Sequence, residues 1–289
     1  MLNSFVADFV KLVKLRLSFL VVFSASISFL IGSKEQGHID WWSWGILTLG
    51  GFLVTAAANG FNEIIEKDLD KLMKRTADRP IPAGHMTTGQ ALVLSLTMGI
   101  LGTIILLELN FLTGVLAVFS IMLYAFVYTP MKRKSPIAVF VGAIPGALPP
   151  LIGYFAAFAN PQISWIPIIL FLIQFVWQFP HFWSIAWVLD DDYKKAGFRL
   201  LPTTRPDKWS ALIILLSTLL LIPVSLMPTI YQFGGYAVAG ISLLSGTYFL
   251  YTAVRFYRSL DIADARKMMY VSFVYLPIVQ LSLLFDFIS

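Results

Sequence analysis

The sequence predicts an all-α, polytopic membrane protein in which nine transmembrane helices form a single domain over residues 1–289. Of its 289 residues, 58% are hydrophobic and only 13% are charged, and the mean hydropathy is +0.78. This composition leaves too little polar surface to cover a soluble core. The apolar runs are continuous over about 20 residues, whereas strands of a membrane β-barrel alternate in polarity over about 10. A helical bundle is therefore the expected architecture.

Nine windows without Lys, Arg, Asp or Glu are long enough to cross about 30 Å of hydrocarbon as helices. In chain order they cover residues 17–33, 41–61, 88–107, 110–129, 137–158, 163–188, 209–229, 233–253 and 268–285. No small-residue cleavage signal follows the first window, so we expect a retained helix there. The fifth window is rich in glycine and proline (Gly142, Pro145, Gly146, Pro149, Pro150, Gly153). This pattern indicates either a broken or thinned helix that leaves room for a ligand, or glycines that pack against neighbouring helices.

The basic residues predict the orientation of the nine helices. Twenty of the 21 Lys and Arg residues precede the first window or lie in the even-numbered loops, and Lys34 is the exception. Because such residues are retained on the cytoplasmic side, we expect a cytoplasmic N-terminus in the cell (inner) membrane and a C-terminus on the far side. The net charge of +5 is then explained by basic juxtamembrane loops that face anionic headgroups of the membrane lipid, and no nucleic acid partner is expected. Without cysteine, disulfides and thiolate metal sites are excluded.

A polar stripe extends from the second window into the loop that follows it. Asn62, Glu66 and Asp70 are spaced four residues apart, so on a helix they share one face. Two carboxylates and an amide suit Mg²⁺, which commonly bridges one or two acids to substrate phosphates. Arg75 and Arg79 follow at the same spacing, and guanidinium groups match phosphate oxygens. The pattern predicts a metal-diphosphate site at the membrane boundary.

The alternative interpretation of this segment is a solvated helix end with i,i+4 ion pairs, such as Asp70 with Lys74. The metal-site interpretation is favoured because Asn62 and Glu66 continue an apolar run, where polar groups are costly and usually functional. We expect the other three acids of the segment to be solvated companions of the site: Glu63, Asp68 and Asp78.

A second polar stripe occupies the sixth window. On a helical wheel Gln178, His181 and Asp192 lie within about 40° of Gln174, so we expect these four side chains to form one polar stripe from mid-membrane to the acidic end of the segment. His181 is flanked by aromatic residues, namely Trp177, Phe179, Phe182 and Trp183. An aromatic-walled pocket with one imidazole suits a large planar ligand with an iron atom. The alternatives are a satisfied core histidine and aromatic residues of the core or of an interfacial belt.

Three consecutive acids follow the sixth window: Asp190, Asp191 and Asp192. Crowded carboxylates repel one another unless a metal neutralises them, so they predict a second metal site that faces the first. The adjacent Tyr193 can donate a hydrogen bond to a phosphate or position an acid.

These motifs together resemble the UbiA superfamily of intramembrane prenyltransferases. The resemblance covers nearly the whole chain: nine helices, with acidic motifs after the second and sixth. The superfamily's first motif is Asn-x3-Asp-x3-Asp, and the branch that acts on heme has Glu at its centre, as Asn62, Glu66 and Asp70 do here. The segments DLDKLMKRTADRPIPAG (68–84), WQFPHF (177–182) and DYKKAG (192–197) also look like that branch. The superfamily's second motif has two Asp four residues apart, but the position four beyond Asp190 is Lys194 here.

The resemblance implies an enzyme that transfers a farnesyl group from farnesyl diphosphate to a vinyl group of heme b and yields heme O with Mg²⁺. It implies Mg²⁺ ligands among Glu66, Asp70, Asp191 and Asp192, with Asn62 and Tyr193 as further catalytic residues. It also implies diphosphate contacts from Arg75, Arg79 and Lys194, and heme contacts from His181, Gln178 and Trp177. A heme A synthase or an oxidase assembly factor is an expected partner.

Two other functions are consistent with the sequence. One is a prenyltransferase with an aromatic acceptor, of the kind used in quinone or chlorophyll synthesis. The other is a transporter or channel, which also places charges in the membrane but would spread them through the midplane.

Overall fold

The computed structural model describes residues 2–288, and these residues are helical apart from the connecting loops, of which 71–87 is the longest, and one isolated bridge between Gly234 and Phe287. The elements are α1 (Leu2–Leu12), α2 (Leu15–Gln36), α3 (Trp41–Asp70), α4 (Thr88–Leu107), α5 (Phe111–Ile121), the π-helix η1 (Met122–Tyr128), α6 (Thr129–Met131), α7 (Ala138–Ala156), α8 (Trp165–Val188), α9 (Asp190–Lys195), α10 (Lys208–Ile230), α11 (Tyr236–Ser259) and α12 (Ile262–Phe285).

Among the described residues, nine helices are long and apolar enough to cross a membrane, with α5, η1 and α6 joined into one span over Phe111–Met131. Each coincides with one predicted window, so the predicted fold class and helix count are confirmed. The largest difference is in α3, which continues past residue 61 to Asp70 and carries the first polar stripe into the bundle.

Several helices begin where a polar side chain caps the first turn. The side chains of Asp40, Thr87, Asn110, Asp207 and Asp261 each accept a hydrogen bond from a backbone N–H of the helix that follows, and these helices are α3, α4, α5, α10 and α12. Such caps satisfy the N–H groups that have no partner within the helix. The first residue of each of these five helices is therefore set by local sequence.

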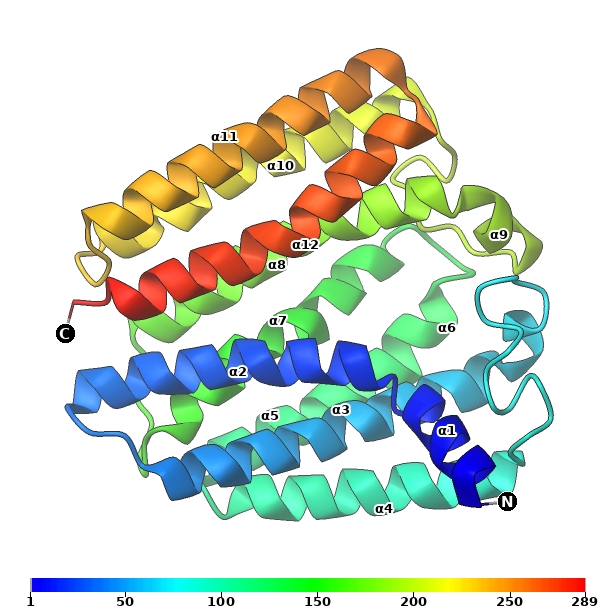
Figure 1. Cartoon of the computed structure of the whole chain (residues 1–289), viewed down its shortest axis with the longest axis horizontal. Coiled ribbons are helices and arrows are strands. Elements are labelled where there is room, and N and C mark those ends of the chain that lie inside the picture. The colour runs from blue at the N-terminus through cyan, green and yellow to red at the C-terminus, as the bar shows by residue number, and fades with distance from the viewer. Residues whose placement is uncertain (1, 289) are drawn as a thin grey trace.

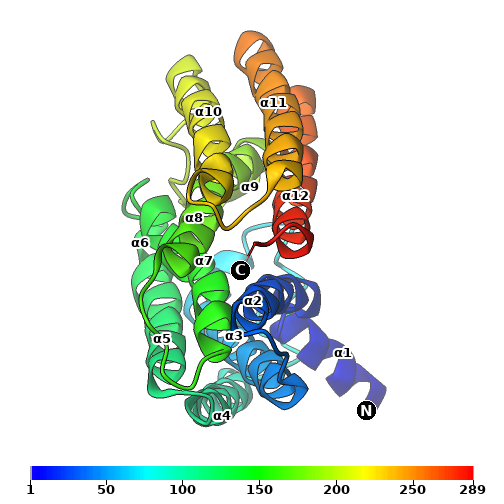
Figure 2. The same cartoon turned by 90° about the vertical axis from the view of Figure 1, so that its left-hand side faces the viewer.

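The bundle has two groups of helices joined by α7 and α8. Figure 2 shows α2 to α5 on one side and α10 to α12 on the other. The loop after α3 lies with α1 and α9 at one end of the bundle, which we call the site end, and the C-terminus lies at the other end (Figure 1). Helices α2 and α12 are joined away from the site end, where Gln280 donates to Ser24 and Lys34 donates to the Leu284 carbonyl. Toward the site end the two helices diverge (Figure 1).

Helix α7 is continuous despite three internal prolines, so the prediction of a broken helix is wrong and the glycine-packing alternative is confirmed. A Cβ added at Gly142 would lie 2.6 Å from the Tyr128 ring, and one added at Gly146 would overlap the Gln178 amide. A Cβ added at Gly153 would overlap the backbone carbonyl of Ala25 in α2. Small residues at these positions let neighbouring elements approach closely, as is typical of membrane helices.

We expect Gly153→Ala to lower the free energy of unfolding by roughly 1–3 kcal/mol, because backbone of α2 cannot move aside as a side chain can. The measurement is unfolding of the purified protein in detergent, followed by circular dichroism. Gly240→Ala is the matched control, since Gly240 lies inside α11 with nothing within 4 Å of the added Cβ. That variant should be neutral or more stable. Equal losses in both variants would contradict the packing argument.

Candidate active site

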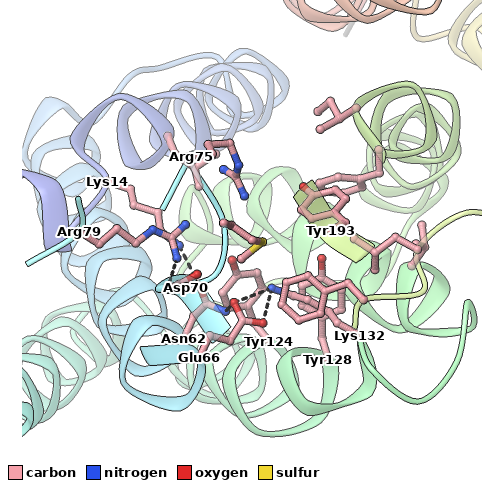
Figure 3. A pocket seen from close by; sticks show the side chains of 17 residues that line it. Lys14, Asn62, Glu66, Asp70, Arg75, Arg79, Tyr124, Tyr128, Lys132 and Tyr193 are labelled. Carbon is pink, nitrogen blue, oxygen red and sulfur yellow. Dashed lines mark hydrogen bonds and ion pairs between the residues drawn. The ribbon is translucent and has the colours of Figure 1, made fainter. Parts of the chain in front are cut away.

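The first polar stripe lies on the inner face of α3 at the site end, where it lines a cavity. Asn62, Glu66 and Asp70 are 1%, 3% and 0% exposed, and all three line the cavity together with Arg75 and Arg79. Figure 3 shows them pointing toward one another and toward the cavity. The structure therefore brings the predicted metal-diphosphate residues together, and the solvated helix end does not describe them.

Glu66 is paired with Lys132, which the sequence analysis did not assign to the site. The Lys132 ammonium lies 2.9 Å from Oε1 of Glu66 and donates to Oε2 at 3.0 Å. Asn62 donates from its amide to Glu66 Oε2 at 2.9 Å and to the Thr129 hydroxyl at 3.0 Å. The amide oxygen of Asn62 accepts from Lys14 at 2.9 Å. Asn62 thus fixes the carboxylate of Glu66 and links it to two basic side chains.

Asp70 is held by the loop that follows α3. Arg79 Nη1 lies 2.5 Å from Asp70 Oδ2, and the Thr76 hydroxyl donates to the Asp70 carbonyl at 2.9 Å. The other carboxylate oxygen, Oδ1, is buried without a hydrogen-bond partner among the described residues, and so is Oε1 of Glu66 apart from its contact with the Lys132 ammonium. Buried carboxylate oxygens are costly unless they are paired. Two of them in one cavity fit a divalent cation with oxygen ligands.

The charge of the cavity favours an anionic ligand. Four basic side chains line it (Lys14, Arg75, Arg79, Lys132) against two acidic ones (Glu66, Asp70). The Arg75 guanidinium lies over the Tyr193 ring, 5.9 Å from its centroid, and forms no ion pair with a described residue. Burial, followed by the nearby charges of Arg79 and Lys132, holds the pKa of Lys14 well below its usual range. An anion in the cavity would relieve this repulsion between cations.

The sequence carried a signal for the opposite wall that was missed. Tyr124, Tyr128 and Lys132 repeat the four-residue spacing of the acidic stripe and all line the cavity. The first two belong to η1, and single π-helical turns inside α-helices occur frequently at functional sites. The Lys132 ammonium lies 4.9 Å from the centre of the Tyr128 ring, which completes this wall. Lys132 was counted only as a topological charge because it follows the span.

The predicted stripe of α8 does not continue to the acids, because α8 ends at Val188 and Asp190–Lys195 form the separate helix α9. Asp190, Asp191 and Asp192 do not line the cavity, whereas Tyr193 does. Asp190 pairs with Lys194, which raises the pKa of that lysine, and Asp191 is exposed. The metal role of Asp191 and Asp192 and the diphosphate role of Lys194 stay predictions.

Asp192 joins the two site loops. Its carboxylate accepts from the backbone N–H groups of Lys74 at 3.1 Å and Arg75 at 3.2 Å, and it pairs with Lys195 at 3.1 Å. Desolvation opposes ionisation, but Lys195 and the two N–H groups outweigh it and hold the pKa of Asp192 below its usual value. Asp192 therefore fixes the backbone that carries Arg75.

We expect Asp192→Ala to speed tryptic cleavage of the loop after α3 without Mg²⁺, because the backbone of Lys74 and Arg75 loses its anchor. Cleavage is followed by mass spectrometry of the purified protein. Asp191→Ala is the control, since that carboxylate has no hydrogen-bond partner among the described residues and is exposed. Unchanged cleavage of Asp192→Ala without Mg²⁺ would argue against this anchor.

The residues predicted to contact heme lie away from the acidic stripe, between α8 and its neighbours. His181 Nδ1 lies 2.8 Å from the Ser272 hydroxyl of α12, and the Trp177 indole donates to the Ser272 carbonyl at 2.8 Å. The Gln178 amide donates to the carbonyls of Ala143 and Gln174, so it joins α8 to α7. The structure therefore does not bring these three residues into the diphosphate cavity, and their role toward heme stays a prediction.

One expected solvated acid is buried. Glu63 is 0% exposed and accepts from the backbone N–H of Ile81 at 3.0 Å, so the expectation for it is wrong. The loop after α3 folds back over the helix and covers this side chain. Asp68 and Asp78 are exposed and pair with Lys71 and Lys11, as expected. The buried carboxylate holds the loop two residues beyond Arg79.

Comparison with known proteins agrees with this architecture. The model of the UbiA prenyltransferase family matches residues 21–276, so the chain belongs to that family, and it is a multi-pass membrane protein. It is 44% identical to the protoheme IX farnesyltransferase of Cytophaga hutchinsonii over 99% of both chains. It is 40% identical to the protein of that name from Christiangramia forsetii, over 98% of this chain and 94% of the relative.

Two solved structures show the same fold. A digeranylgeranylglyceryl phosphate synthase aligns with a TM-score of 0.81 at 20% identity, over 97% of this chain and 98% of that one. A UbiA homologue from Archaeoglobus fulgidus bound to GPP and Mg²⁺ aligns with a TM-score of 0.69 at 11% identity, over 96% of this chain and 99% of that one. At these identities the likeness concerns the fold.

Proposed function

We propose that this protein transfers the farnesyl group of farnesyl diphosphate to a vinyl group of heme b and so produces heme O. In this reaction the bond between C1 of farnesyl and the diphosphate oxygen breaks, and C1 bonds to the terminal vinyl carbon. Water adds its hydroxyl to the neighbouring carbon, and its proton leaves with the diphosphate. The observation that carries the proposal is the cavity in which two buried carboxylates, one of them with an oxygen that has no hydrogen-bond partner among the described residues (Asp70 Oδ1), lie among an excess of basic side chains. The relatives named protoheme IX farnesyltransferase support the choice of donor and acceptor.

The acidic residues of the cavity suit a cation, and its basic residues suit the diphosphate. Glu66 and Asp70 would hold Mg²⁺, as is consistent with the Mg²⁺ in the structure of the A. fulgidus homologue. The cation supplies charge neutralisation at the leaving diphosphate. Arg75 and Arg79 would present guanidinium groups to the same oxygens, and Lys14 would supply a further ammonium. Donors fixed before the reaction stabilise the charge that develops on the leaving group.

Part of the cavity lining is apolar and suits the prenyl chain. Leu17, Val139, Phe182 and Ile185 line it beside the polar groups. Such a lining excludes water from the allylic carbon until the acceptor has reacted. The distal part of the farnesyl chain can stay in hydrocarbon, where each buried methylene retains about 0.8 kcal/mol.

An aromatic cluster beside the cavity suits the planar acceptor. The cluster consists of Trp177, His181, Phe182 and Phe273. The His181 ring stacks on Trp177 at 4.3 Å between centroids and lies 5.4 Å from Phe182 and 5.0 Å from Phe273. Phe182 belongs to both the cluster and the cavity lining, so a macrocycle on this cluster would lie next to the prenyl donor. Phe273 of α12 is 44% exposed.

We also propose that the site end faces the cytoplasm in the cell membrane, as the positions of 20 of the 21 Lys and Arg residues support. A heme A synthase or oxidase assembly factor that receives the product stays a prediction.

The test is incubation of membranes that contain the protein with farnesyl diphosphate, Mg²⁺ and heme b, followed by mass analysis of the extracted hemes. The proposal expects a product heavier than heme b by one farnesyl group and one hydroxyl group. Arg75→Ala should lower its rate. Prenylation of an aromatic quinone precursor instead of heme b would favour the aromatic acceptor.

A further inference from the structure

The hydrogen bonds of Ser272 define the tautomer of His181. The Ser272 hydroxyl lies 2.6 Å from the Met269 carbonyl oxygen, a distance at which two oxygens need the hydroxyl hydrogen between them. A serine has one O–H donor, so toward His181 Nδ1, at 2.8 Å, the hydroxyl can only accept. Nδ1 of the neutral imidazole therefore carries the hydrogen. Nε2 is left with its lone pair.

Ser272 also holds the ring on which His181 stacks. The Trp177 indole donates to the Ser272 carbonyl at 2.8 Å, and the planes of the Trp177 and His181 rings differ by only 17°. One residue of α12 thus restrains both rings of α8, the imidazole through its hydroxyl and the indole through its carbonyl. The orientation of the imidazole is fixed as well as its tautomer.

Nε2 has no hydrogen-bond partner among the described residues, although His181 is only 7% exposed. A lone pair held in this way is the arrangement that metal-binding histidines use, with the other ring nitrogen donating to a fixed oxygen. The partly exposed rings of Phe182 and Phe273 flank the imidazole and provide apolar contact for a macrocycle.

We infer that Ser272 is a positioning residue for the acceptor: it holds His181 as the Nδ1–H tautomer so that Nε2 binds the iron of heme b. The inference rests on the proposed function, because it takes heme b as the acceptor. It adds the iron as a point of recognition, which would fix the distance of the macrocycle from the prenyl donor.

The test uses the purified full-length protein in nanodiscs, loaded with heme b without farnesyl diphosphate. Resonance Raman spectra of the ferrous form report the iron–histidine stretching band, whose frequency depends on the hydrogen bond at Nδ1. His181→Ala should abolish this band. Ser272→Ala should lower its frequency and weaken heme binding by about tenfold, the lower range for loss of a group that orients a metal ligand. Ser272→Thr keeps the hydroxyl and should preserve the frequency.

Ser282→Ala is the matched control, because Ser282 of α12 makes the same bond to the carbonyl three residues earlier, that of Val279. It should leave the band and the heme affinity unchanged. An unshifted band in Ser272→Ala would overturn the inference, and so would a wild-type spectrum without an iron–histidine band. Neither result would touch the proposed function, whose own test is the mass of the product. An absence of farnesylated heme would overturn both.

Discussion

Glu66→Gln is expected to lower the rate of farnesyl transfer by about 10²–10³-fold, the loss that follows removal of one fixed group that stabilises developing charge. The substitution keeps the volume of the side chain and its contact with Asn62, but removes the charge that would hold the cation. Glu66 is 3% exposed, so solvent cannot replace the missing charge. The measurement is the initial rate of product formation at several Mg²⁺ concentrations. We also expect the Mg²⁺ concentration at half-maximal rate to rise.

Asp68→Asn is the control for this experiment. Asp68 lies two residues from Glu66 on the same helix, but its side chain is 76% exposed and, among the described residues, pairs only with Lys71 at 3.7 Å. Its neutralisation should leave the rate and the Mg²⁺ dependence unchanged. Wild-type turnover by Glu66→Gln at equal protein and Mg²⁺ would contradict the assignment of Glu66 as a cation ligand.

The fold was predictable because the bilayer restricts the choice of structure. A run of about 20 apolar residues in lipid satisfies its backbone only as a helix, so composition and window length were sufficient to locate nine spans. Helix α1 was not predicted, because a short amphipathic segment beside the membrane has no comparable constraint. The acidic stripe was predictable for a similar reason: Asn62 and Glu66 extend an apolar helix, and such polar groups are costly there.

The second half of the site was less predictable, because it depends on where a helix stops. The wheel that aligned His181 with Asp192 assumed one helix, but Leu189 leaves helical geometry with φ −105° and ψ 15°. Asp192 then turns to the backbone of Lys74 and Arg75. The burial of Glu63 likewise depends on a tertiary contact, because the loop after α3 folds back and covers it. Spacing along one segment cannot reveal such contacts.

Lys132→Met is expected to separate cation binding from catalysis. The ammonium of Lys132 forms an ion pair with the carboxylate of Glu66, so Mg²⁺ must compete with this ammonium in the wild type. Without this competitor Glu66 is left unpaired in a buried site, and Mg²⁺ alone should bind more tightly and raise the melting temperature of the variant more than that of the wild type. Farnesyl transfer should nevertheless fall by about 10²-fold. In the wild type, bound Mg²⁺ would displace the Lys132 ammonium from Glu66, and the ammonium would then contact the diphosphate; the variant lacks this group.

Methionine is the suitable replacement because it keeps an apolar stem beside the rings of Tyr128 and Phe198. The centroids of these rings lie 4.9 and 5.5 Å from the Lys132 ammonium. Thermal unfolding with and without Mg²⁺ gives the first readout, and the rate of product formation gives the second. Lys134→Met removes an exposed charge from the same loop and should change neither. If Lys132 and Glu66 formed a purely structural ion pair, the variant would be less stable both with and without Mg²⁺. An increase in melting temperature with Mg²⁺ no larger than that of the wild type would therefore contradict the competition between Lys132 and the cation.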